Sequence, residues 1–222
     1  MAILIVTGTN TDVGKTIATA ALALAYKKAG LEVIGIKPAQ TGEPDGRGDA
    51  HTLAQLAGID TYDFARYPEP LAPNLAARRA RLPQLELADT AARIRHFDAP
   101  GRVVLVEGAG GLLVRLADSW TLADLAQELA APVVVVTSTG LGSLNLAELT
   151  VEAAQNRGLE VLGLIGGRLP VEPDLATALN LSEFHNVTGV PYLGSIVDGQ
   201  LNALGEVDLQ LPAVFPELPG RG

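Results

Sequence analysis

The sequence contains no cysteine and carries no excess of positive charge. The lack of cysteine excludes disulfide bonds, thiolate metal sites and a cysteine nucleophile. Asp and Glu number 25 against 16 Lys and Arg, so the formal net charge is −9 at pH 7. A chain with this balance offers no basic surface of the kind that a nucleic-acid backbone requires. We therefore expect no nucleic-acid partner.

Long hydrophobic runs and a targeting segment are also missing. The longest apolar stretch lies around residues 129–136, which is far shorter than the roughly 18 to 20 residues that span a membrane. Met1 and Ala2 lead directly into an apolar, strand-like segment. Neither the basic region nor the small-residue cleavage site of a secretory signal is visible there. The sequence thus predicts a cytoplasmic protein that does not engage a membrane.

What the chain does contain is enough apolar material for one large core. It has 222 residues, of which 48% are hydrophobic and 18% are charged. Burial of that much apolar surface can offset the conformational entropy lost on folding. We expect a single domain over residues 1–222, whose Pro-containing tail over residues 211–222 is mobile.

Short apolar runs alternate with helical patterns along the chain. The runs are typical of strands buried on both faces, and they lie at residues 3–7, 33–37, 103–107, 133–137 and 161–165, with a weaker one at 192–196. Helical patterns occupy residues 15–29, 86–97, 121–130 and 144–157. This alternation predicts an α/β fold, with a mostly parallel sheet covered by helices on both faces. A Pro-rich segment over residues 67–83 is interpreted as an excursion from that domain.

The strongest functional signal follows the first apolar run. It reads Gly8-Thr-Asn-Thr-Asp-Val-Gly14-Lys15-Thr16 and leads into a long helical pattern, which is the setting of a phosphate-binding loop. Glycines let backbone N–H groups turn toward phosphate oxygens, and the helix N-terminus adds partial positive charge. Lys15 would reach the terminal phosphates, and the Thr16 hydroxyl would bind Mg²⁺. Five residues separate the two glycines, one more than usual, and a tight turn with a surface lysine is the alternative interpretation.

A glutamate ends the third apolar run, in the sequence Glu107-Gly108-Ala109-Gly110-Gly111. A carboxylate at the end of a buried strand, beside a phosphate loop, is placed for a second contact with magnesium. The glycines permit a ligand to approach the backbone closely. The alternative is a simple turn with a solvated or helix-capping glutamate.

Polar residues also follow the second apolar run, in the sequence Lys37-Pro-Ala-Gln-Thr41-Gly. Ligands of parallel α/β sheets bind at the carboxyl ends of the strands, so we expect Lys37 and Thr41 to face the same crevice as the phosphate loop. Asp49 is a weaker candidate by spacing alone, because an aspartate at a helix start is often a cap. Magnesium usually takes one or two carboxylates together with phosphates and water. Asp49 and Glu107 would complete such a site.

Taken together, these motifs resemble the dethiobiotin synthetases, a family of P-loop NTPases related to amidoligases of cobalamin synthesis and to cell-division ATPases. The resemblance covers residues 1 to about 165, through the motifs at 6–16, 37–42, 48–49, 106–111 and 140–145. It implies a single-domain P-loop NTPase fold. It also implies an ATP- and Mg²⁺-dependent reaction in which 7,8-diaminononanoate and CO₂ give dethiobiotin, ADP and phosphate.

In that family an amine becomes a carbamate, the carbamate takes the γ-phosphoryl group, and the second amine closes the ring. The resemblance implies that Lys37 and Lys15 are catalytic and flank the transferring group, and that the metal ligands are Thr16, Asp49 and Glu107. It implies as residues that bind the nucleotide Asp12, Val13, Gly14, Lys15, Thr16, Ile17, Asp49, Glu107, Gly108, Ala109, Gly110, Gly167, Arg168, Val197, Asp198 and Gly199. It implies as substrate-binding residues Thr11, Thr41, Gly111, Leu141, Gly142, Ser143, Leu144 and Asn145.

Two further expectations follow from the resemblance. In the family, the loop that corresponds to residues 140–145 holds the substrate carboxylate across a dimer interface, which implies a homodimer. N–H groups at the start of a helix suit that role. Many family members carry an asparagine that contacts adenine, whereas this chain reads Ile165-Gly-Gly-Arg168. Nucleoside triphosphates other than ATP therefore remain open as co-substrates.

Two other functions are compatible with a phosphate loop. A related amidoligase would activate a carboxylate by phosphorylation and take nitrogen from ammonia or glutamine. A partitioning-type ATPase would instead act through partners and membranes. Against the second, the sequence shows neither a second lysine near the start of the phosphate loop nor a basic amphipathic helix at the C-terminus.

Overall fold

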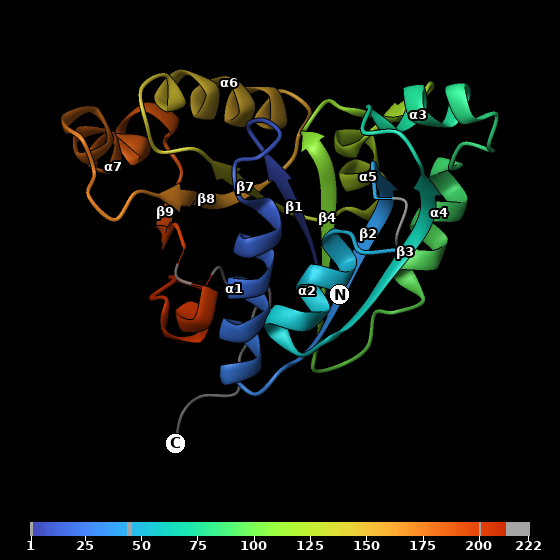
Figure 1. Ribbon diagram of the computed structural model, residues 1–222, viewed down its shortest axis with the longest axis horizontal. Helices are drawn as coiled ribbons and strands as arrows, with labels where there is room; N and C mark the ends of the chain where they lie inside the picture. The colour runs from blue at the N-terminus through green and yellow to red at the C-terminus, as the bar shows by residue number, and fades with distance from the viewer. Residues whose placement is uncertain (1, 44–45, 200, 212–222) are drawn as a thin grey trace.

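The computed structural model describes residues 2–43, 46–199 and 201–211. A seven-stranded sheet forms its centre (Figure 1). Its strands are β1 (Ile3–Gly8), β2 (Glu32–Thr41), β3 (Asp60–Tyr67), β4 (Arg102–Gly111), β7 (Val133–Thr137), β8 (Val161–Leu169) and β9 (Tyr192–Val197). They lie in the order β3-β2-β4-β1-β7-β8-β9, and each neighbouring pair is parallel. The predicted parallel α/β sheet is confirmed.

Helices cover both faces of this sheet. They are α1 (Lys15–Lys28), α2 (Asp49–Ala57), α3 (Pro73–Ala80), α4 (Leu87–Arg95), α5 (Leu122–Leu129), α6 (Ser143–Gln155), α7 (Leu175–Thr188) and the 3₁₀ helix η1 (Leu201–Glu206). Buried residues of α1, α2 and η1 pack on one face, and those of α3 to α7 pack on the other. In Figure 1, α1 and α2 lie in front of the sheet. A small antiparallel hairpin, β5 (Arg115–Ala117) and β6 (Trp120–Thr121), leads into α5.

The central strand β1 shows why an unbroken apolar run forms a strand here. Ile3 and Ile5 pack in the core of one face, whereas Leu4 and Val6 pack in the core of the other. Successive side chains of a strand point to opposite faces, so a strand with helices on both sides has no solvent-facing position for a polar residue.

Strands β2 and β4 are longer than the sequence predicts. Residues Lys37 to Thr41 continue β2 because they pair with β3, where Lys37 lies opposite Asp63 and Thr41 lies opposite Tyr67. Strand β4 likewise continues to Gly111. The expectation that residues 38–41 and 108–111 follow these strands is wrong, since both segments continue β2 and β4, whereas Lys37 and Glu107 lie inside their strands as predicted.

Several elements are missing from the sequence prediction. Strand β3 is an edge strand with a mostly half-exposed, polar sequence, so it lacks the apolar run of a buried strand. Helix α7 has no apolar stripe, although a side-chain cap from Asp174 and the left-handed Gly189 mark its ends. Helix α3 forms inside the Pro-rich excursion, where Pro73 occupies its first turn.

Helices α5 and α6 are capped in different ways at their first turns. The capping box between Thr121 and Asp124 is present at the start of α5. At the start of α6 the cap is Gly142, in a left-handed conformation with φ 88°, and the Ser143 hydroxyl donates back to the Gly140 carbonyl. No helix among the described residues is both long and apolar enough to cross a membrane. Residues 212–222, and hence nearly all of the tail that the sequence predicts to be mobile, lie outside the described part.

Candidate active site

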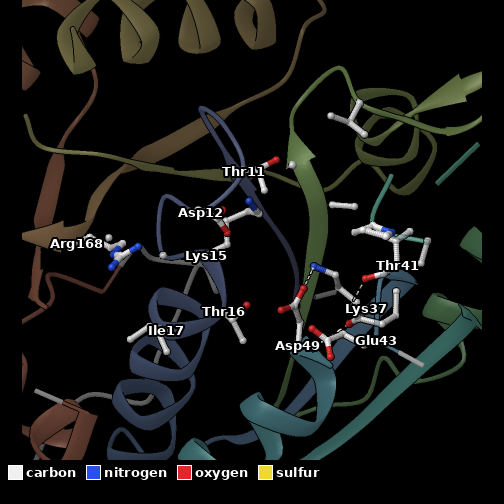
Figure 2. Close-up of a pocket in the computed structure, with 18 of the residues that line it drawn as sticks. Thr11, Asp12, Lys15, Thr16, Ile17, Lys37, Thr41, Glu43, Asp49 and Arg168 are labelled. Atoms are coloured by element: carbon white, nitrogen blue, oxygen red, sulfur yellow. Dashed lines mark hydrogen bonds and ion pairs between the residues drawn. The ribbon is translucent and has the colours of Figure 1, made fainter. Parts of the chain in front are cut away.

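The carboxyl ends of β1, β2, β4, β8 and β9 border one large cavity of about 950 Å³ (Figure 2). All of these strands are parallel members of one sheet, so their carboxyl ends meet at the same edge. Helix α2 adds Asp49 to the lining, and the segment before α3 adds another wall. Most of the predicted site residues therefore come together at this cavity, although they lie far apart in the sequence.

The phosphate loop packs directly against β8. Asp12 and Gly14 have left-handed backbones, with φ of 59° and 91°. A Cβ atom on Gly14 would lie 2.4 Å from the Gly167 carbonyl oxygen, and one on Gly167 would lie 2.0 Å from the Val13 carbonyl oxygen. Glycines at both positions are required for this close approach. Among the residues that the structure describes, no side chain caps the first turn of α1, which leaves its N–H groups available for phosphate oxygens.

Lys15 is the first of two buried lysines in the site. Its Nζ atom donates a hydrogen bond to the Asn10 carbonyl oxygen, at 3.0 Å. Burial lowers the pKa of Lys15, and the positive charge of Lys37 lowers it further, against the opposing effect of Glu107, Asp49 and Asp12. An ammonium group that is poorly compensated within the protein is well prepared to bind the negative phosphates of a nucleotide.

Lys37 lies at the centre of a cluster of charges and is only 4% exposed. Its ammonium group is 2.5 Å from Asp49 Oδ2 and donates to Glu107 Oε1 at 2.9 Å and to the Gly108 carbonyl oxygen at 2.8 Å. Burial alone would lower the pKa of Lys37, but the charges of Glu107 and Asp49 and their hydrogen bonds outweigh it, and the pKa lies above its ordinary value. This lysine therefore stays charged at neutral pH.

The two carboxylates around Lys37 are also joined to the phosphate loop. Glu107 Oε1 accepts a hydrogen bond from Thr16 Oγ1 and Glu107 Oε2 accepts one from Thr19 Oγ1, both at 3.0 Å. Burial raises the pKa of Asp49, but the Lys37 charge, hydrogen bonds from Lys37 and Thr16, and the Lys15 charge together bring it below the usual range. Both carboxylates therefore contact the ammonium group of Lys37.

Thr16, Asp49 and Glu107 fit a magnesium ion by their chemistry. All three offer oxygen atoms, which Mg²⁺ prefers, and the two carboxylates already surround a positive charge. Within the described part of the chain, no group of three or more His, Cys, Asp and Glu side chains is placed to hold a metal by itself. An ion at this site would take its remaining ligands from phosphates and water.

The wall of the cavity beyond Lys37 includes residues that the sequence prediction missed. Thr41 and Thr11 line the cavity as predicted. The chain from Pro70 to Pro73 closes the space near Thr41, and a Cβ atom on Gly42 would lie 2.7 Å from Pro70 Cβ. The cluster of prolines over residues 67–83 was the available signal for this wall, but prolines alone do not reveal which surface they will face.

The opposite end of the cavity is formed by the ends of β8 and β9. Figure 2 shows Arg168 on the far side of the phosphate loop from Lys37 and Thr41. An Arg168 Nη2 atom lies 3.2 Å from Asp198 Oδ2. Gly167, Val197 and Gly199 line the same end. These are five of the residues for which the family resemblance implies nucleotide binding, and their role stays a prediction.

The predicted substrate loop lies apart from this cavity. None of the five residues from Leu141 to Asn145 lines it, and the Leu141 side chain is 92% exposed. Gly111 lines a second, smaller cavity of about 360 Å³, together with Thr11, Leu146 and Leu149. A single chain therefore does not bring residues 141–145 to the Lys37 cluster, and their predicted role across a dimer interface stays a prediction.

Comparison with known proteins adds to this geometry. A family profile described as an AAA domain matches residues 3–200. Over 222 aligned residues the chain is 59% identical to the ATP-dependent dethiobiotin synthetase BioD of Corynebacterium diphtheriae, covering 97% of this chain and 100% of that protein. It is 62% identical to the protein of the same name from Corynebacterium efficiens, with 90% of each chain covered.

Solved structures share the architecture at much lower identity. The Signal Recognition Particle 54 kDa protein of Aeropyrum pernix K1 matches with a TM-score of 0.57 and 21% identity, over 96% of this chain and 45% of that one. Chloroplast FtsY of Physcomitrella patens matches with a TM-score of 0.53 and 22% identity, over 97% of this chain and 65% of that one. At these identities the likeness establishes the fold alone.

Proposed function

This chain belongs to the ATP-dependent dethiobiotin synthetase family, and we propose that it converts 7,8-diaminononanoate, CO₂ and ATP into dethiobiotin, ADP and phosphate. One observation carries this proposal beyond the family name. Lys37 and Asp49 line the same cavity as the phosphate loop, with Thr41 beside them, and the buried Glu107 contacts Lys37 from behind. A site of this kind can hold a nucleotide and a second small molecule together.

The reaction has three chemical steps that balance. One amine of the substrate adds to CO₂ and loses a proton, which gives a carbamate. A carbamate oxygen then attacks the γ-phosphorus, and the bond to the ADP oxygen breaks. The second amine attacks the carbamoyl carbon and gives up one proton, and phosphate leaves as the cyclic urea closes. Positioning and charge stabilisation account for most catalysis in phosphoryl transfer.

We assign these tasks to residues at the cavity. Lys15 binds the terminal phosphates, and Lys37 stabilises the negative charge that gathers between the carbamate and the phosphoryl group. Thr16, Asp49 and Glu107 would hold Mg²⁺, which when bound neutralises charge on the phosphate oxygens. Lys37 lies 2.5 Å and 2.9 Å from the two acids, which places its ammonium group directly beside the proposed metal ligands.

The nucleotide base and the substrate carboxylate have separate binding regions in our proposal. We propose that Gly167, Arg168 and residues 197–199 surround the base, with other nucleoside triphosphates open besides ATP, because all five line the cavity beyond the phosphate loop. We also propose that the working form is a cytoplasmic homodimer. In it, residues 141–145 of one subunit would reach the substrate carboxylate held near Thr11 and Gly111 of the other.

The decisive experiment supplies the purified protein with 7,8-diaminononanoate, ¹³C-bicarbonate, Mg²⁺ and each of the common nucleoside triphosphates. We expect dethiobiotin that retains the ¹³C label, identified by mass spectrometry, with one phosphate released per product. Absence of a cyclised product with every nucleotide would contradict the proposal. Parallel reactions with ammonia or glutamine test the amidoligase alternative, whose product carries no label from bicarbonate.

A further inference from the structure

Gln40 connects the strand that carries Lys37 to the helix that carries Asp49. It belongs to β2 and is only 5% exposed. Its Oε1 atom accepts a hydrogen bond from the Asp49 backbone N–H at 2.8 Å, and its Nε2 atom donates to the Thr41 carbonyl oxygen at 3.2 Å. These partners determine the orientation of the amide, because a backbone N–H can only donate and a backbone carbonyl can only accept.

Helix α2 depends on this contact for its first turn. The residue that precedes it, Gly48, has no side chain, so within the described part of the chain this position makes no side-chain cap. The first N–H groups of a helix have no partner inside the helix. Gln40 supplies an acceptor from a different element and thereby attaches the first residue of α2, Asp49, to β2.

Because Gly48 has no side chain, it leaves room for the side chain of Gln40. Its backbone is extended, with φ −139° and ψ −166°, which any residue can adopt. A Cβ atom at this position would nevertheless lie 2.5 Å from both Cδ and Oε1 of Gln40. A side chain here would therefore push the Gln40 amide away from the Asp49 N–H, and we call the two residues together the Gln40–Gly48 latch.

We propose that Gln40 is a positioning residue, and that the latch holds the Asp49 carboxylate where it can bind the divalent cation of the reaction. The Asp49 side chain is 39% exposed, so packing alone constrains it weakly. Its backbone is held by Gln40, three residues along β2 from Lys37, whose ammonium group contacts the carboxylate. This inference rests on the proposed metal ligands, and partners of a ligand commonly change metal affinity by about 10- to 100-fold.

The test measures Mn²⁺ binding by electron paramagnetic resonance in the presence of a non-hydrolysable ATP analogue and without the diamine. Gln40→Ala and Gly48→Ala should each weaken Mn²⁺ binding by about tenfold or more. The double variant should bind Mn²⁺ at least as tightly as the single variant with the lower affinity. The reason is that Gln40→Ala removes the atoms that a Cβ atom at position 48 would meet. Affinity for the nucleotide in EDTA should stay within about threefold of wild type, whereas a general structural defect would weaken both.

Asp49→Asn and Gln84→Ala provide the references. Gln84 also bridges a side chain and a backbone carbonyl, at Asp118 and Asn74, but it does not line the cavity, and its replacement should leave Mn²⁺ binding unchanged. If Asp49→Asn weakens Mn²⁺ binding tenfold while both latch variants stay within threefold, the positioning role is wrong and the metal ligands stand. If Asp49→Asn does not change Mn²⁺ binding, Asp49 is not a metal ligand. The proposed metal site is then wrong, and so is the role that we propose for the latch.

Discussion

Lys37 forms ion pairs with two carboxylates of the site, those of Asp49 and Glu107. Its ammonium group neutralises Asp49 and Glu107, the same carboxylates that we expect to bind Mg²⁺. Two cations so close together repel each other strongly in a buried environment. We therefore expect the metal to bind weakly until nucleotide phosphates add negative charge, at which point Lys37 can move from the carboxylates to the phosphoryl group.

Replacement of Lys37 tests its catalytic role. Lys37→Gln removes one positive charge from the transition state, so turnover should fall by at least about 10²-fold. The measurement is dethiobiotin formation at saturating nucleotide and diamine. Lys28→Gln, an exposed lysine at the end of α1, is the control and should keep full activity. A loss of less than about threefold in Lys37→Gln would remove this residue from the mechanism.

In the protein without nucleotide, Lys15 should lower the stability of the folded state. Its pKa in the folded chain lies below the ordinary 10.5, so the unfolded chain binds the proton more tightly, and stability rises with pH between the lowered pKa and 10.5. Lys15→Met should therefore melt at a higher temperature than wild type at pH 7, although it binds nucleotide poorly. This advantage should shrink as the pH approaches 10.5. Calorimetry without nucleotide over pH 7 to 10 measures it, and an equal or lower melting temperature at pH 7 would contradict it.

At the scale of elements, the contact between the phosphate loop and β8 determines where the nucleotide can bind. The Val13 carbonyl and Gly167 approach so closely that no Cβ atom fits between them. Gly167→Ala should push the loop away from β8 and weaken nucleotide binding by about tenfold or more, since small misplacements of binding groups are costly. Fluorescence titration with a labelled nucleotide measures this. Gly205→Ala, where a Cβ atom meets no atom of the described residues within 4 Å, should bind normally.

Helix α5 offers a test of local stability that is separate from the site. Thr121 accepts a hydrogen bond from the Asp124 backbone N–H, and the Asp124 carboxylate accepts one from the Thr121 backbone N–H. Thr121→Ala removes one half of this capping box and should lower the free energy of unfolding by about 1 kcal/mol. Urea denaturation followed by circular dichroism gives the value. An unchanged midpoint would show that the cap contributes nothing.

At the scale of the whole molecule, α6 and α7, which pack against each other, both carry exposed apolar side chains. Leu149 of α6 is 54% exposed, and Leu175 and Leu179 of α7 are exposed as well. Large apolar patches on a protein surface commonly mark contacts with other chains. The proposed homodimer would cover such a surface and bring residues 141–145 near the second cavity, which Leu149 also lines.

The dimer can be tested by one substitution on that surface. Leu149→Glu places a charge where the second subunit would pack, so the protein should sediment as a monomer while wild type sediments as a dimer. Turnover should fall together with dimerisation, because the monomer would lack the partner's residues 141–145. Analytical ultracentrifugation supplies the measurement, and Glu148→Gln, an exposed neighbour on α6, is the control. A monomeric wild type with full activity would refute the predicted dimer.

The sequence by itself determined the elements whose signal is local. The apolar run of β1, the glycines and Lys15 of the phosphate loop, and the Thr121 capping box are all visible within about ten residues of chain. Each is set by the physical chemistry of neighbouring residues, namely burial on two faces, permissive backbones and side-chain caps. The motif at Lys37 could be found in the same way.

Only the tertiary structure decided which distant residues meet. The contact of Gln40 with Asp49, the packing of Gly167 on Val13 and the wall from Pro70 to Pro73 join segments that no local pattern relates. Edge strand β3 also formed against its local polarity, because pairing with β2 satisfied its backbone on one side. Contacts of this kind depend on how the whole sheet is ordered, which is why Lys37, Asp49 and Glu107 could each be predicted as functional but their ion pairs could only be seen in the fold.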